Sequence, residues 1–182
     1  MQRMHPSLAV CLFAMIATAS LSHAAYTGVT LQLHTTIQAP TGTKKVFRLY
    51  ANFSQGSDEV VSWGGTPQNG STIFKTGPCQ DTVFFQSGAN AAPSQEAIDK
   101  NPLAQWDTFA TIGVNIAEQG VPYDQAFFTP GFPNIAGSMV NISNAVILIL
   151  PGSPQARADF AGDGDPQLRV LLAQLAVELK AM

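Results

Sequence analysis

The clearest pattern in the chain is Phe47-Arg48-Leu49-Tyr50-Ala51-Asn52-Phe53, in which every second side chain is apolar. A period of two is typical of a β-strand that buries one face and exposes the other. We therefore predict a strand over residues 47–53. Its apolar face should enter the core, and Arg48, Tyr50 and Asn52 should form a polar face.

The segment before this strand has the same period. Its apolar residues fall on one side, and polar residues occupy the positions between them; the apolar set is Val29, Leu31, Leu33 and Ile37. We predict a second half-buried strand here. Pro40-Thr41-Gly42 interrupts the pattern before residues 47–53 begin.

Short strand-like segments continue along the chain, separated by glycine, proline and asparagine turns. They cover residues 59–63, 71–76, 82–86, 106–114 and 139–150, whereas the composition of residues 120–137 is typical of a loop. Ser94 is suited to cap a single helical turn that ends near Lys100. The pattern predicts an all-β fold with one short helix: an antiparallel sandwich of jelly-roll or immunoglobulin-like type.

The C-terminal segment is ambiguous from its residues alone. A leucine series between residues 168 and 179 follows a helical spacing. Val170 and Val177 suit a strand equally well. Periodicity by itself favours the helix.

The first 24 residues have the three parts of a secretory signal peptide. Arg3 and His5 precede an apolar run over residues 8–17, and small residues lead to Ala24. We predict cleavage after Ala24, one domain over residues 25–182, and secretion to the extracellular space or cell surface. The run is shorter than the about 20 residues needed to span a bilayer, so we expect no integral membrane segment after cleavage.

The composition argues against several classes of function. Charged residues make up 12% of the chain and the net charge is −3, so nothing suggests a nucleic-acid partner. His34 is the only histidine after residue 24, and no Gly-x-Ser-x-Gly segment occurs. Zinc sites and Ser-His-Asp catalysis are therefore disfavoured, and we expect no catalytic residues and no obligatory cofactor.

Cys79 is the only cysteine outside the predicted signal peptide. It is a buried thiol, a site for a disulfide to another chain, or a reactive thiol. The chain also contains three Asn-X-Ser sequons, at Asn52, Asn69 and Asn141. In a source that glycosylates, these are candidate glycosylation sites of a secreted glycoprotein.

Two sets of residues are candidates for ligand binding. Asp159, Asp163 and Asp165 lie on a glycine-rich segment, which either holds Ca²⁺ through carboxylate oxygens or forms a solvated acidic turn without EF-hand spacing. Trp63, beside Gly64-Gly65, and Tyr123 carry aromatic faces. These side chains either stack on a sugar or partner protein, or pack in the core.

Several segments in order resemble a group of uncharacterised secreted β-sandwich modules from planctomycete-like bacteria and aquatic microbes. The matching segments are residues 47–53, 57–65, 82–86, 106–113 and 169–175, within a likeness that spans residues 45–177. In those modules the last motif is similar to a strand, so the resemblance implies a C-terminal strand. It implies no assigned activity and no catalytic residues.

Taken together, these patterns favour a non-enzymatic extracellular module that binds or assembles, with an extracellular protein or a glycan as its partner. A carbohydrate-binding module, with or without Ca²⁺, is the alternative. A glycoside hydrolase is a third interpretation, because two of the twelve acidic residues could form a catalytic carboxylate pair.

Overall fold

The computed structural model describes residues 25–65, 72–75, 82–87, 91–119, 126–128, 134–136, 138–142, 145–160 and 167–179. Within these residues the chain forms antiparallel strand pairs and one short α-helix, which confirms the all-β sandwich prediction. None of the described helices is long and apolar enough to cross a membrane. The predicted signal peptide lies outside the described residues.

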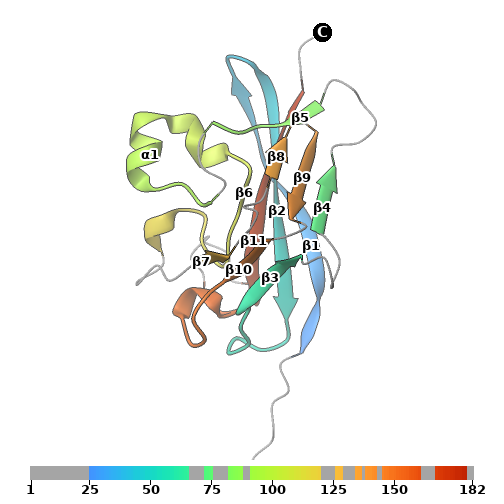
Figure 1. Ribbon diagram of the computed structural model, residues 1–182, viewed down its shortest axis with the longest axis vertical. Coiled ribbons are helices and arrows are strands. Elements are labelled where there is room, and N and C mark those ends of the chain that lie inside the picture. Colours follow the sequence, from blue (N-terminus) through green and yellow to red (C-terminus); the bar gives the residue numbers. More distant parts are fainter. Residues whose placement is uncertain are drawn as a thin grey trace, which may run out of the picture.

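The larger sheet has the strand order β1-β2-β11-β5 (Figure 1). Its strands are β1 (Tyr26–Ala39), β2 (Gly42–Phe53), β11 (Arg169–Leu179) and β5 (Thr82–Phe84), and β6 (Phe109–Ala110) also pairs with β11. The central strand β11 is buried on both faces between β2 and β5. A strand buried on both faces carries apolar residues on both sides, so the leucines of β11 do not follow a period of two. The helical alternative is wrong.

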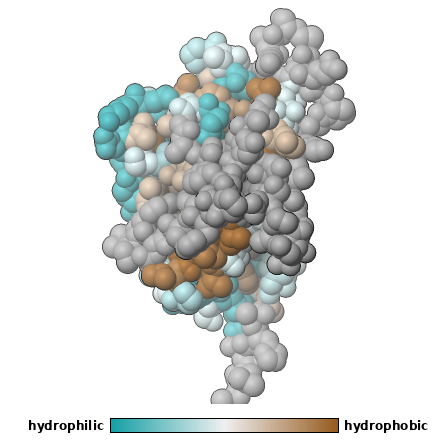
Figure 2. Space-filling view, viewed as in Figure 1, coloured by the Kyte–Doolittle hydropathy of each residue, from teal (hydrophilic) through white to brown (hydrophobic). Residues whose placement is uncertain are grey.

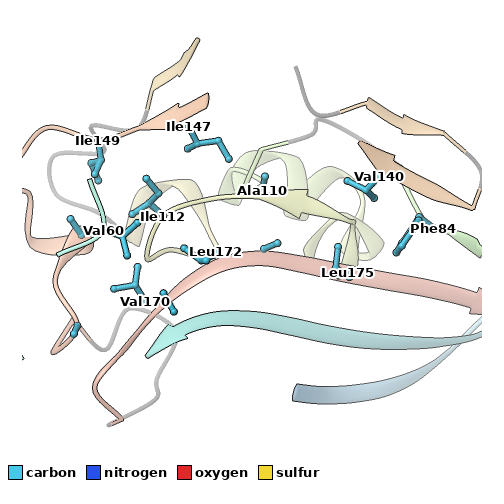
Figure 3. Close-up of a cluster of buried hydrophobic side chains, with 14 residues drawn as sticks. Val60, Phe84, Ala110, Ile112, Val140, Ile147, Ile149, Val170, Leu172 and Leu175 are labelled. Carbon is cyan, nitrogen blue, oxygen red and sulfur yellow. The ribbon is translucent and has the colours of Figure 1, made fainter. Parts of the chain in front are cut away.

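Two three-stranded sheets form the second layer. One has the order β3 (Ser62–Gly65), β10 (Ala145–Leu148), β7 (Ala126–Phe128), and the other β4 (Thr72–Lys75), β9 (Met139–Ile142), β8 (Asn134–Ala136). The main core lies between this layer and the larger sheet (Figure 3). There Ile147 and Val140 face Leu172 and Leu175, and all four are buried.

Part of residues 91–119 covers the opposite face of the larger sheet, while β6 joins the sheet and Ala110 and Ile112 enter the main core. This segment contains α1 (Gln95–Lys100), the 3₁₀-helices η1 (Pro102–Trp106) and η2 (Ala117–Gln119), and β6; a further 3₁₀-helix, η3 (Pro154–Ala156), precedes β11. Ser94 Oγ accepts a hydrogen bond from the Ala97 amide, as predicted for the cap. No residue of α1 is buried, and hydrophilic side chains gather over this region (Figure 2).

Several predicted boundaries are wrong. In residues 106–114 only β6 forms a strand, and η1 runs through Trp106. The predicted loop at 120–137 includes β7 and β8. The 139–150 segment is two strands, and the predicted strand at 59–63 is β3, which begins at Ser62. Turn-rich segments paired through the second layer acquire strand structure from their neighbours rather than from their own composition.

The predicted burial of β1 is wrong for three of its four apolar residues, whereas Ile37 is half-buried. Val29, Leu31 and Leu33 are 59%, 55% and 50% exposed. Among the described residues, the main core draws its large-sheet members from β2, β5, β6 and β11, and none from β1. The second layer therefore leaves most of the apolar side of this edge strand open to solvent, although Val29 lines a cavity together with Trp63 of β3.

The apolar face of β2 packs against the main core as predicted, but its polar face is buried as well. Arg48 and Tyr50 are only 5% and 3% exposed, and Lys44 on the same face is fully buried. Residues 91–119 cover this face at Arg48: the Gln174 side chain, which stands beside Arg48 in the sheet, donates to the carbonyls of Gln105 and Asp107. Lys44 packs against Phe85, and the Arg169 guanidinium lies over the Tyr50 ring. The alternation correctly predicted the strand but not which side of it meets water.

Candidate functional site

A cavity of about 270 Å³ lies between the larger sheet and residues 91–119. Its lining comes from three separate segments. Arg48 belongs to β2, His34 to β1, and Gln105, Trp106, Asn115 and Ile116 to the covering segment. A cavity of this size is slightly below the roughly 300–1,000 Å³ of drug-sized sites, so it can accept a single small group.

Arg48 is the permanent charge of this cavity. Its Nε donates to Oε1 of Gln174 at 3.3 Å. The Gln174 amide nitrogen donates to the carbonyls of Gln105 at 2.8 Å and Asp107 at 3.0 Å, so the amide oxygen is turned toward Arg48. Gln174 is fully buried. These hydrogen bonds fix the orientation of the Gln174 amide, whose oxygen accepts from Arg48.

Arg48 lacks a carboxylate partner within the part of the chain that the structure describes. Buried charges are costly unless they are paired and hydrogen-bonded. The guanidinium group is always protonated and offers five donors, of which one serves Gln174. The remaining donors belong to a side chain that lines the cavity, so the site is suited to an anion.

Two rings form one wall of the cavity. The His34 and Trp106 ring centroids are 6.3 Å apart and their planes are inclined at 39°. His34 sits where the β1–β2 register shifts between Leu33 and Thr35, and such a bulge re-aims a side chain. The bulge therefore brings an exposed imidazole from the sheet edge to the mouth of the cavity.

A second, more apolar cavity of about 310 Å³ contains Trp63. Tyr26, Val29, Phe53 and Val61 contribute to its lining. The Trp63 indole N–H donates to the Thr111 carbonyl at 2.8 Å, and the ring is half-buried against the main core. Trp63 therefore has a structural anchor as well as a face toward the groove, while Tyr123 lies outside the described residues.

The predicted calcium ligands are described only at Asp159. Both of its carboxylate oxygens accept hydrogen bonds from Arg157, at 3.0 Å from Nε and 2.7 Å from Nη2. Asp163 and Asp165 lie outside the described residues. Within the described ranges, no three His, Cys, Asp or Glu side chains form a group able to hold a metal ion. Calcium binding stays a prediction.

The remaining site predictions also stay untested. The Asn52 amide donates to the Gly28 carbonyl at 3.2 Å and to Thr30 Oγ1 at 2.8 Å, so a glycan on this nitrogen would have to displace both bonds. Asn141 is described through its backbone, which pairs with Ile73 and Asn134. Asn69 and Cys79 lie outside the described residues.

The Arg48 cavity was not among the sites predicted from the sequence. Arg48 was expected on a solvent-facing side, and Trp106 was expected in a strand. Residues 34, 48 and 106 share no motif or spacing, because they come from three segments that meet only in the folded chain. Comparison with protein-family models, curated proteins and solved structures finds no match to this chain.

Proposed function

We propose that the chain is an exported, non-enzymatic module that assembles with further copies of itself through β1. One observation carries this proposal: β1 is a long edge strand whose outward apolar residues Val29, Leu31 and Leu33 are at least half exposed. Edge strands offer backbone hydrogen-bonding groups to other chains, and soluble proteins usually blunt them with charged residues. Tyr26–Ala39 contains no Asp, Glu, Lys or Arg.

The sequence of β1 is suited to pairing with its own copy. Between the register shifts at Tyr26/Gly28 and Leu33/Thr35 the strand is regular. An antiparallel pair centred on Leu31 sets Leu31 against Leu31 of the second copy and Val29 against Leu33. Cross-strand apolar pairs stabilise a sheet, and an uncharged strand meets no like-charge repulsion in such a symmetric contact.

The predicted export signal is consistent with this role. The Ala25 carbonyl accepts a hydrogen bond from the Ser54 amide at 3.1 Å, so the first residue after the predicted cleavage point already contacts the residue that follows β2. Cleavage after Ala24 would therefore start the mature chain at the edge strand itself. The secreted product would expose β1 without a leader attached to its end.

The oligomeric state of residues 25–182 tests the proposal. We expect concentration-dependent dimers by light scattering coupled to gel filtration. Leu31→Lys should give monomers, because the central register sets two ammonium groups face to face. The control is Leu150→Lys, since Leu150 is 64% exposed but lies outside β1.

Variants with opposite charges at position 31 test whether the partner of β1 is a second copy of the chain. Leu31→Lys and Leu31→Glu should each be monomeric alone and should associate when mixed. The double variant Val29→Lys/Leu33→Glu should again self-associate, because the proposed register pairs Lys with Glu. Monomeric wild-type protein at all concentrations, or equal effects of the Leu31 and Leu150 variants, would overturn the proposal.

A further inference from the structure

The Arg48 cavity is independent of the assembly surface, and its chemistry points to a different ligand. We propose that it binds the carboxylate of an acidic sugar residue, a uronic acid. The inference rests on a buried cation that lacks a carboxylate among the described residues, and on the aromatic wall beside it.

The charge of the cavity favours a monoanion. Arg48 is the one permanent cation among its lining residues. A guanidinium group matches a carboxylate through two parallel hydrogen bonds. A phosphate dianion would require further positive charge, whereas a singly charged carboxylate is balanced by Arg48 alone.

The lining of the cavity favours a carboxylate attached to a sugar ring over a small carboxylate such as acetate. Trp106 and His34 present aromatic rings at the cavity, and such faces pack against the apolar face of a sugar ring. Gln105 and Asn115 add amide groups to the lining, and amides both donate to and accept from hydroxyls. A cavity of about 270 Å³ suits one sugar residue, so the expected ligand is a single unit of an acidic polysaccharide.

The two tryptophans of the chain make the test specific. Trp63→Phe leaves Trp106 as the only indole, and Trp106→Phe leaves Trp63. We expect galacturonate or glucuronate to change the fluorescence of the Trp63→Phe protein in a saturable manner and to leave the Trp106→Phe protein unchanged. Neutral galactose should bind at least tenfold more weakly.

Arg48→Met should reduce uronate affinity at least tenfold, measured by calorimetry. Its matched control is Lys45→Met, which removes one positive charge three residues earlier on β2, where the exposed side chain points to the opposite face. The control should bind as wild type does. Leu31→Lys should also bind normally, so failure of assembly and failure of this site are distinguishable.

Three results would overturn the inference. The first is the absence of a saturable response to either uronate in the Trp63→Phe protein. The second is an equal response to acetate or chloride, which would make the cavity a site for any small anion. The third is equal loss of binding in Arg48→Met and Lys45→Met. If Arg48→Met does not fold, the fluorescence comparison still decides the question.

Discussion

Lys44 and Arg48 lie four residues apart on the same face of β2, and both side chains are buried. The Lys44 ammonium group has three partners within the chain. Its Nζ lies 2.9 Å from Glu178 Oε1, 2.8 Å from Thr41 Oγ1 and 3.9 Å from the centre of the Phe85 ring. Arg48 has a neutral amide in place of the carboxylate and a cavity in place of the ring. Lys44 is thus enclosed by groups of the chain itself, whereas the Arg48 side chain lines a cavity where the proposed anion would bind.

If the cavity binds the proposed carboxylate, one sheet face serves both stability and recognition. A buried ion pair is a weak source of net stability, but the loss of one partner leaves an isolated charge and is strongly destabilising. The Lys44–Glu178 pair therefore has to be kept intact. The hydrogen bond to the oriented Gln174 oxygen offsets part of the desolvation cost of Arg48. A bound carboxylate would supply the missing negative charge.

Breaking the Lys44 pair should have the largest effect. Lys44→Met leaves the Glu178 carboxylate, only 14% exposed, without its ammonium partner. We expect the free energy of unfolding to fall by about 3 kcal/mol, measured by urea denaturation. The double variant Lys44→Met/Glu178→Leu should recover most of this loss, because it removes both charges. A double variant no more stable than Lys44→Met would contradict this account.

The sequence predicted the strands better than their surroundings. The alternation at residues 47–53 identified β2, and Ser94 marked the start of α1, because both signals are local. The burial of each face depends on what covers it. Residues 91–119 cover Arg48 and Arg169 lies over Tyr50. Val29 and Leu31 are more than half exposed, and no local period contains this information.

The candidate site was less accessible to sequence reasoning for the same reason. Trp63 stood out beside two glycines, yet its indole N–H is bonded to Thr111. The cavity instead depends on a bulge at His34, a 3₁₀-helix at Trp106 and an amide at Gln174. Each is unremarkable in the sequence. The register of β1, β2 and β11 brings Arg48 near Gln174 and His34, and η1 supplies Trp106 from outside these strands.

A carboxylate introduced at the cavity mouth should give Arg48 an ion-pair partner within the chain, as Glu178 is for Lys44. We expect His34→Glu to raise the free energy of unfolding by about 1 kcal/mol, since its partner Arg48 is buried although position 34 is exposed. The same variant should no longer bind uronates, because the built-in carboxylate competes for the guanidinium. His34→Gln is the neutral control of equal size. Equal stability of the two variants would show that position 34 does not reach Arg48.

The smallest expected change in stability belongs to Arg48→Met, which completes the comparison with Lys44→Met. The substitution removes a buried charge that has no carboxylate among the described residues and leaves one acceptor, Gln174 Oε1, without its donor. These opposing effects should cancel to within about 0.5 kcal/mol in urea denaturation. Thermal unfolding then separates the two roles: uronate should raise the melting temperature of the wild-type protein, as ligands of the native state do, but not that of Arg48→Met. A loss of about 3 kcal/mol, equal to that of Lys44→Met, would mean that Arg48 already has an anionic partner within the chain. The proposal that the cavity binds an external carboxylate would then be wrong.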